Sequence, residues 1–353
     1  MKVLMTTDAV GGVWTYALDL CRALAPYDVQ FLIATMGRRP DTAQRAEAAQ
    51  LPNVQLVESD YKLEWGESPW RDIEESGEWL LELEKEYTPD VVHLNGYAQG
   101  VCAFRAPKIV VAHSDVLSWW QAVKGEAAPP EWNEYRNRVR SGLLGADVVV
   151  APTRAMLNTV VDVYDLPATS STRTILNGRD ATHFVPREKE LYVFSAGRLW
   201  DEAKNVAALQ DAAPNVRWPI RVAGESRINQ HSAVEFLGRL PLNQLVEKMA
   251  RASIYALPAR YEPFGLSALE AALCGCSLVL GDIATLREVW GDAALFVAPD
   301  DEKQLAATLN ELIDNPKLRQ EMGRRAQNCA RKYSLEKFGE NYLSLYRNLE
   351  AIS

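Results

Sequence analysis

The sequence predicts two α/β domains in tandem, each a doubly wound parallel sheet with helices on both faces. Two observations predict this fold: short apolar runs alternate with amphipathic helical patterns, and the alternation stops at the polar, turn-rich residues 177–189 and then restarts. We expect an N-terminal domain over residues 1–180, a second domain over residues 181–333, and a C-terminal helix over residues 334–353 that crosses back to the first domain. If the domains face each other, the carboxyl ends of their strands line a central cleft.

The composition is that of a globular protein, with 48% hydrophobic and 24% charged residues in a chain of 353. A formal net charge of −9 disfavours a general nucleic-acid binder, which carries a basic face. The five cysteines are scattered and predict no disulfide framework, and Cys274 and Cys276 lack the partners of a zinc site. Because no signal-peptide pattern and no run of about 18 apolar residues occurs, we expect a cytoplasmic protein without a transmembrane segment.

In the first domain, short apolar runs predict strands and amphipathic stretches predict the helices between them. The expected strands are Lys2–Thr7, Gln30–Thr35, Val91–Leu94, Ile109–His113 and Asp147–Ala151. The expected helices are Val13–Leu24, Asp72–Glu86, Glu131–Leu144 and Thr153–Tyr164. This order is that of successive parallel βαβ units.

The second domain repeats the alternation. Its expected strands are Leu191–Ala196, Ile220–Ala223, Val234–Leu237, Ile254–Leu257 and Ser277–Leu280. Its expected helices are Asn205–Ala212, Pro241–Ala252 and Gly265–Cys274. From Asp300 onward the pattern is helical, with a break at Asn315-Pro316 and with Ser334 as the expected N-cap of the last helix.

Two motifs that follow predicted strands suit the binding of phosphate groups. The Gly11-Gly12 pair lets the backbone approach a ligand, and the helix N-terminus after it favours an anion; a plain tight turn is the alternative. It is not the G-x-G-x-x-G fingerprint, and no acidic residue closes the second strand, so a dinucleotide-dependent oxidoreductase is disfavoured. Arg198 and Lys204, six residues apart, can bind two phosphates, although a lone pair of this kind is usually two solvated surface cations.

The strongest motif joins the strand Ile254–Leu257 to the helix that follows it. Glu262 lies in the loop and Glu270 about one and a half turns into the helix, so two carboxylates can hold two hydroxyl-bearing groups of one ligand. The amides at the helix start can meet oxygen atoms or negative charge. The alternative is a pair of solvated acids, but this helix is largely apolar, so a glutamate on it needs a partner. Between the two acids lie Pro263, Phe264, Gly265 and Leu266.

A histidine and several aromatic residues complete the set of candidates. His113 ends a predicted strand and can hydrogen-bond a substrate or move a proton; a structural histidine is the alternative. Asp115 can orient His113 or cap the next helix. Three tryptophans follow predicted strand ends, and because aromatic faces suit sugars we expect them to contact the acceptor, although such rings more often fill cores. These residues are Trp14, Trp119 and Trp120.

Taken together, these motifs resemble the retaining nucleotide-sugar glycosyltransferases of the GT-B fold, and most closely glycosyltransferase family four. The likeness extends to ILNGRDATHF near the domain seam, VEFLGRLP in the second domain and LREVWGDAALFVAPDD before the last helices. The resemblance implies that the backbone at Gly12 approaches the donor phosphate and that Arg198 and Lys204 neutralise the diphosphate. It implies that Glu262 and the amides of Phe264–Leu266 bind the transferred sugar.

The same resemblance implies that Glu270 holds the ribose, that the base lies against the backbone near Leu240, and that His113 is close to the reacting sugar. It implies front-face transfer from a UDP- or GDP-sugar to a hydroxyl acceptor, with the leaving phosphate taking the acceptor proton. No cofactor and no metal are then expected, in agreement with the lack of G-x-S-x-G, Walker and D-x-D patterns.

The identity of the acceptor is left open, and a saccharide, a lipid-linked compound or a small molecule all suit it. Three alternatives to transfer also stay open: a nucleotide-sugar binding protein without activity, a retaining disaccharide phosphorylase, and a sugar-nucleotide epimerase. The sequence has no cluster of four to eight basic residues, so peripheral membrane contact is disfavoured. A nucleic-acid partner is not expected.

Overall fold

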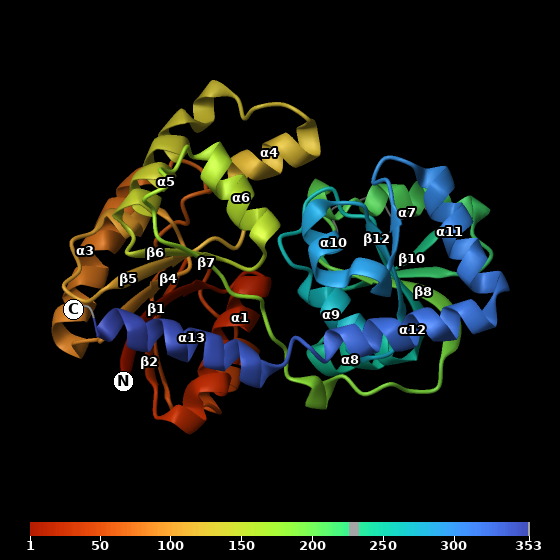
Figure 1. Cartoon of the computed structure of the whole chain (residues 1–353), viewed down its shortest axis with the longest axis horizontal. Coiled ribbons are helices and arrows are strands. Elements are labelled where there is room, and N and C mark those ends of the chain that lie inside the picture. Colours follow the sequence, from red (N-terminus) through yellow and green to blue (C-terminus); the bar gives the residue numbers. More distant parts are fainter. Residues whose placement is uncertain (226–232, 352–353) are drawn as a thin grey trace. The chain divides into compact units, whose positions relative to one another are not determined.

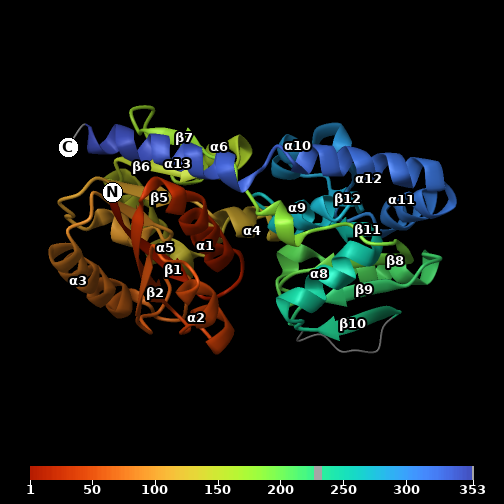
Figure 2. The same ribbon diagram turned by 90° about the horizontal axis from the view of Figure 1, so that it is seen from below.

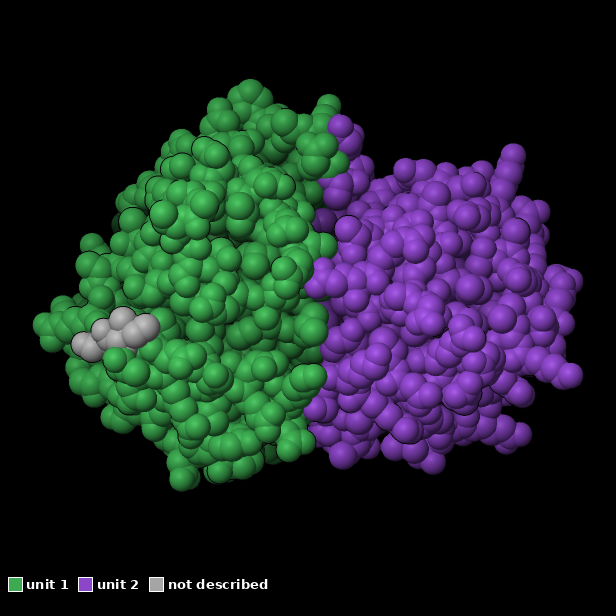
Figure 3. Space-filling model, viewed as in Figure 1, with its two compact units in different colours: residues 1–121, 126–178, 335–353 green, residues 122–125, 179–334 purple. Residues whose placement is uncertain are grey.

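A computed structural model of the protein describes residues 1–225 and 233–351, so residues 352 and 353 at the end of the expected C-terminal helix lie outside it. The chain forms two compact units, which Figure 3 shows in green and purple. The first unit contains Met1–Gln121, Glu126–Gly178 and Leu335–Ser353. The second contains Ala122–Gly125 and Arg179–Ser334. The last helix therefore belongs to the first unit although it follows the second in sequence.

The first unit is built on a parallel sheet with the strand order β3-β2-β1-β4-β5-β6-β7. The strands are β1 (Lys2–Asp8), β2 (Gln30–Met36), β3 (Val54–Glu58), β4 (Val91–Leu94), β5 (Lys108–Val111), β6 (Val148–Ala151) and β7 (Thr172–Thr174). The helices are α1 (Gly12–Leu24), α2 (Thr42–Ala49), α3 (Trp70–Tyr87), α4 (Val116–Lys124), α5 (Asn133–Gly145), α6 (Arg154–Val163) and α13 (Leu335–Glu350).

The register of this sheet places its functional candidates at one edge. Met5 pairs with His93 between β1 and β4, and His93 pairs with Ile109 between β4 and β5. Because the strands are parallel, the loops after β1, β4 and β5 leave the sheet at the same, carboxyl edge. Gly11, Asn95 and His113 stand in these loops.

Helix α13 completes the core of the first unit. It packs against α1 and near β4 (Figure 1), and its buried face carries Phe338, Tyr342 and Tyr346. These rings contact Tyr16 of α1 or His93 of β4 at centroid distances of 5.3–6.1 Å. The apolar face of α13 is thus buried against the first unit, in agreement with the predicted return of the C-terminal helix.

The second unit is built on a parallel sheet with the order β10-β9-β8-β11-β12-β13, most of which can be followed in Figure 2. The strands are β8 (Glu190–Ala196), β9 (Ile220–Ala223), β10 (Val234–Gly238), β11 (Ala252–Leu257), β12 (Ser277–Gly281) and β13 (Leu295–Val297). The helices are α7 (Val206–Ala212), α8 (Leu242–Arg251), α9 (Leu266–Leu273), α10 (Ala284–Trp290), α11 (Glu302–Asp314) and α12 (Pro316–Ala330).

Alternate residues of the central strands enter two different cores in this unit. On β11, Tyr255 packs with residues of α9 and α12, whereas Ile254 packs with residues of α7 and α11 on the other face. Both faces of the strand are therefore buried, which explains why its sequence is a continuous apolar run. The two parallel sheets with helices on both faces confirm the predicted fold class.

Several elements differ from the sequence prediction. The strands β3, β7 and β13 were not predicted, because each is short, lies at or near a sheet edge and carries partly exposed residues. Helices α2, α4 and α10 were missed as well. The predicted break at Asn315-Pro316 is confirmed, since the Asn315 side chain accepts from the Leu318 amide (3.0 Å) and Pro316 begins α12. The caps set these helix boundaries more sharply than hydrophobic periodicity does.

Candidate functional site

The loop after β8 brings a lysine and a glutamate together in the second unit. Lys204 ends a 3₁₀ turn (η5, Glu202–Lys204), and its ammonium lies 2.5 Å from Oε2 of Glu262, which follows β11. The side chains are only 16% and 12% exposed. The structure thus joins two candidates that stand 58 residues apart in sequence.

Arg198 begins the same loop, but its side chain is directed differently. Its Nη2 donates to Oδ2 of Asp201 (2.9 Å), and its guanidinium lies 5.5 Å from the centre of the Trp200 ring. The Asp201 carboxylate also accepts from the Ala203 amide, which fixes the turn that carries Lys204. The Arg198 side chain is 41% exposed and is therefore accessible to a ligand at the carboxyl edge of the second sheet.

The segment between β11 and α9 forms a tight turn around Glu262. Oε1 of Glu262 accepts from the Gly265 amide (3.0 Å), and its backbone carbonyl accepts from the Thr285 hydroxyl (2.6 Å). Gly265 has φ = 91°, a conformation that glycine adopts without strain. Pro263 and Phe264 are buried, and Leu266 begins α9. Among the residues that the structure describes, no side chain caps this helix, so its first turn of amides is directed toward the Glu262 loop.

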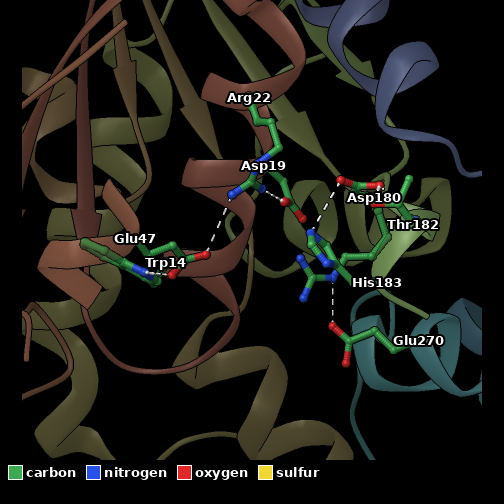
Figure 4. A network of polar contacts seen from close by, with 9 residues as sticks. Trp14, Asp19, Arg22, Glu47, Asp180, Thr182, His183 and Glu270 are labelled. Carbon is green, nitrogen blue, oxygen red and sulfur yellow. Dashed lines mark hydrogen bonds and ion pairs between the residues drawn. The ribbon is translucent and has the colours of Figure 1, made fainter. Parts of the chain in front are cut away.

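Glu270 is the fifth residue of α9 and has the partner that its apolar surroundings require. Arg179 Nε donates to its Oε1 at 2.8 Å, and both side chains are 11% exposed (Figure 4). Arg179 stands where the chain enters the second unit; its amide donates to Tyr333 O (3.1 Å), and it forms a β-bridge with Ser334. The sequence reasoning missed Arg179, although the need of Glu270 for a partner was the signal that could have found it.

Leu240 follows β10 and is half-buried against the core of the second unit. It contributes its aliphatic side chain to this core, so only its backbone is suited to the contact predicted for a base.

In the first unit, the Gly11-Gly12 pair forms the turn between β1 and α1. Gly11 has φ = 86° and precedes Gly12, the first residue of α1, which has no side-chain cap. Asp8 Oδ1 accepts from the Val10 amide (2.6 Å), and Arg38 donates to Ala9 O (2.9 Å). The turn therefore presents uncapped amides at the carboxyl edge of the first sheet, as the glycine pair predicts.

His113 lies two residues beyond β5 and is held by Asn95, which follows β4. The His113 Nε2 atom is 2.7 Å from Asn95 Oδ1, and its ring meets that of Tyr16 edge to face at 4.4 Å. Burial lowers the pKa of His113 to about 3, so the imidazole is neutral at pH 7. Sequence reasoning missed Asn95.

Asp115 caps α4, one of the two roles considered for it. Its Oδ1 accepts from the Ser118 amide (2.9 Å) and from the Tyr164 hydroxyl (2.8 Å), and the residue is 3% exposed. Burial raises the pKa of Asp115 above its ordinary range. The buried carboxylate thus holds the start of α4, and an acceptor contact by Asp115 stays a prediction.

The three tryptophans differ in how much ring surface they offer. Trp14 is 3% exposed within the core of the first unit, and its Nε1 donates to Glu47 Oε2 (3.1 Å; Figure 4). Its ring faces are covered, so they cannot serve as a platform for a sugar in this structure. Trp119 and Trp120 are half-buried neighbours on α4 whose rings meet edge to face at 5.9 Å.

Neither a membrane-spanning helix nor a group of metal-binding side chains occurs in the described part of the chain. No helix within residues 1–225 and 233–351 is long and apolar enough to cross a membrane. Over the same residues, no group of three or more His, Cys, Asp and Glu side chains is gathered closely enough to hold a metal ion.

Two protein families match almost the whole chain between them. Residues 10–183 match Glycosyltransferase Family 4, and residues 179–329 match the family described as Glycosyl transferases group 1. The chain is 27% identical to alpha-maltose-1-phosphate synthase of Mycolicibacterium smegmatis over 75% of this chain and 78% of that protein. It is 30% identical to glycogen synthase of Mycobacterium tuberculosis, over 52% of this chain and 49% of that protein.

Solved structures share the two-domain architecture. Sucrose-phosphate synthase from Thermosynechococcus elongatus aligns with a TM-score of 0.82 and 17% identity over 100% of both chains. HepE of Anabaena, solved in complex with UDP and glucose, aligns with a TM-score of 0.75 and 18% identity over 99% of this chain and 100% of that one. At these identities the likeness establishes the fold.

Proposed function

Because this chain belongs to the glycosyltransferases related to family four, we propose that it moves a sugar from a UDP- or GDP-sugar to a hydroxyl acceptor with retention of anomeric configuration. The observation that carries this proposal is the Lys204–Glu262 pair beside the uncapped start of α9. The cation, the carboxylate and the amides at the start of α9 lie at one edge of the sheet, and they match the three chemical parts of a sugar diphosphate. These parts are the phosphates, the sugar hydroxyls and the oxygens between them.

In this proposal, Arg198 and Lys204 bind the diphosphate. Cleavage of the glycosyl–phosphate bond leaves positive charge on the sugar and negative charge on the departing phosphate, which cations that are already in place stabilise. The bond from the anomeric carbon to the phosphate oxygen breaks while a bond to the acceptor oxygen forms on the same face. The acceptor proton moves to the leaving phosphate oxygen, and the nucleoside diphosphate departs.

The ligand-free contacts fit this assignment. Lys204 and Glu262 form an ion pair at 2.5 Å. When the donor binds, its phosphate can pair with the lysine ammonium, and the glutamate carboxylate can accept hydrogen bonds from the sugar hydroxyls. Glu262 keeps a second acceptor contact to the Gly265 amide, which holds it at the start of α9. Donor binding thus replaces the Lys204–Glu262 ion pair with two contacts, lysine to phosphate and glutamate to sugar hydroxyl. Neither charge is left unpaired, so the free-energy cost is small.

Glu270 is proposed to bind the ribose hydroxyls, with Arg179 holding its carboxylate. Arg179 Nε donates to Oε1, which holds the carboxylate in place on α9. His113 is proposed to contact the reacting sugar, and the backbone at Gly12 the donor phosphate. Trp119, Trp120 and Asp115 remain the proposed acceptor contacts.

We also propose that the reaction needs neither a metal nor a cofactor, because Arg198 and Lys204 supply the positive charge. The acceptor is a saccharide, a lipid-linked compound or a small molecule that carries a free hydroxyl. The complex of HepE with UDP and glucose makes UDP-glucose the first donor to test on this chain.

The test has two stages. Thermal shift with UDP, GDP, ADP and NAD identifies the bound nucleotide, and mass spectrometry then screens the matching sugar nucleotides against acceptor mixtures with and without EDTA. We expect a pyrophosphate nucleotide to bind and a glycosylated product to form with EDTA present. Lys204→Ala should lower the rate of product formation by about 10²–10³-fold, whereas Lys248→Ala, which replaces an exposed lysine on α8, should not lower it. Binding without any product would favour a binding protein, and stabilisation by NAD alone would contradict the proposal.

A further inference from the structure

A chain of buried hydrogen bonds in the first unit connects helix α13 to His113. The Tyr346 hydroxyl lies 2.6 Å from His93 Nδ1, and His93 Nε2 lies 3.2 Å from Asn95 Oδ1. The same Asn95 oxygen lies 2.7 Å from His113 Nε2. Tyr346 and His93 are fully buried. One amide oxygen therefore faces two imidazole rings, and its orientation decides how both are protonated.

The backbone of β1 fixes the orientation of the Asn95 amide. Its Nδ2 donates to the Thr6 carbonyl (2.8 Å), and its own backbone amide donates to the Thr6 hydroxyl (2.9 Å). A carbonyl can only accept, so the NH₂ group of Asn95 must lie on the Thr6 side. The oxygen is then the atom that faces His113, and because an amide oxygen can only accept, His113 Nε2 must carry a proton.

The state of the other ring nitrogen follows from the charge of His113. Burial lowers the pKa of His113 and that of His93 to about 3, so both rings are neutral at pH 7. A neutral imidazole has one N–H, and in His113 the bond to Asn95 places it on Nε2. Nδ1 then bears a lone pair, and no hydrogen-bond partner is found for it among residues 1–225 and 233–351.

We propose that Asn95 is a positioning residue that holds His113 as its Nε2–H tautomer, so that Nδ1 accepts a hydrogen bond from a substrate hydroxyl. The identity of that hydroxyl rests on the proposed function, whereas the tautomer does not. A histidine held in this way recognises a hydroxyl donor and rejects a group that can only accept. It would not serve as a general acid, because its only proton is committed to Asn95.

Nitrogen NMR of the full chain tests the tautomer without any substrate. The sequence has four histidines, so ¹⁵N-labelled imidazole spectra are simple, and His113→Gln assigns the His113 signal. We expect protonated Nε2 and unprotonated Nδ1 for His113 at pH 7, and a mixture of tautomers in Asn95→Ala. A wild-type signal from the Nδ1–H tautomer would overturn the proposal. So would an unchanged Nε2–H signal in Asn95→Ala.

Kinetics with the donor that the sugar-nucleotide screen identifies test the positioning role. Loss of the tautomer should lower kcat of Asn95→Ala by about 10–100-fold, with a donor KM within about threefold of wild type. Asn95→Asp keeps an acceptor oxygen but adds a charge and loses the NH₂ donor to the Thr6 carbonyl. His113 should then be charged near pH 7, with both ring nitrogens protonated, and kcat should fall as well. If Asn95→Ala does not fold, the wild-type spectrum still tests the tautomer, and kcat of Asn95→Asp still tests the positioning role.

Tyr346→Phe is the matched control, because it removes the hydroxyl that bonds His93, at the other end of this series of hydrogen bonds, and leaves the Asn95–His113 bond in place. It should lower stability but leave kcat within about twofold and the His113 signals unchanged. If kcat falls as much in Tyr346→Phe as in Asn95→Ala, the effect is merely structural, and the proposal is overturned. Absence of transfer in the wild type would refute the proposed function alone, since the spectra still report the tautomer.

Discussion

Replacing Arg179 by alanine should destabilise the second unit and weaken its binding of a nucleoside diphosphate. The Arg179–Glu270 pair joins N and O atoms 2.8 Å apart, with both side chains 11% exposed. At an effective dielectric constant of about 20 and a charge separation of about 4 Å, the attraction is about 4 kcal/mol. Desolvation offsets part of it, so we expect a net loss of about 2–4 kcal/mol when one partner is removed and the other charge stays buried.

Thermal unfolding and calorimetry measure the two effects. A loss of 2–4 kcal/mol should lower the Tm of the second unit by about 4–16 °C, given about 2–4 °C per kcal/mol for a domain of this size. The orphaned Glu270 carboxylate should turn toward water or take up a proton. Either change removes a charged acceptor from the proposed ribose site, so the affinity for the nucleoside diphosphate should fall about tenfold.

A double-mutant cycle with Glu270→Gln isolates the pair. Because the double variant buries no unpaired charge, it should be at least as stable as Arg179→Ala, with a coupling of about 1–3 kcal/mol. Arg287→Ala, on α10, removes an exposed ion pair with Asp282 in the preceding loop and serves as the control, with a Tm close to that of the wild type. Effects of Arg179→Ala and Glu270→Gln that add within about 0.5 kcal/mol would refute the proposed coupling.

Three further predictions follow from other residues. Arg198→Ala and Lys204→Ala should each lower kcat by about 10²–10³-fold without unfolding the protein, and a value within twofold of wild type would remove that residue from the phosphate site. Glu262→Gln should reduce transfer strongly but leave the calorimetric affinity for the free nucleoside diphosphate unchanged; lost affinity would instead place Glu262 at the nucleotide. Burial raises the pKa of Glu64 from 4.5 to about 7, so the folded state holds an extra proton between these values. The unfolding free energy should therefore fall by about 3 kcal/mol as pH rises from about 4.5 through 7, and Glu64→Gln should lack this fall when compared with wild type at each pH.

The sequence was sufficient to predict the positions of strands that are buried on both faces of a sheet. Strands such as β11 are buried on both faces and have unbroken apolar runs, so their positions were predicted to within a residue or two. Edge strands such as β3 and β7 are short and carry polar residues on partly exposed faces, so their sequences are hard to distinguish from loops. Their existence depends on a neighbouring strand that offers unpaired backbone groups, which is information outside the segment itself.

Site residues could be predicted where their position in a loop directly after a strand was itself the signal. Glu262 and Lys204 were singled out because each follows a strand, and the structure brings them into contact. Arg179 and Asn95 were missed because their roles depend on distant partners: Glu270 lies 91 residues from Arg179, and His113 is 18 residues beyond Asn95, in the loop after the next strand. Trp14 was proposed as a sugar platform, but the helix that carries it turns its ring into the core.

The central claim is transfer from a sugar nucleotide with retained configuration, and the proton NMR spectrum of the product tests it most directly. The anomeric coupling constant of the newly formed glycoside, recorded early in the reaction, reports the configuration at the transferred carbon. We predict the configuration of the donor in the product and equal rates with and without EDTA. The rate should be about 10²–10³-fold lower for Lys204→Ala, while Lys248→Ala remains active. An inverted product, or a reaction that stops with EDTA and resumes with magnesium or manganese, would contradict this mechanism.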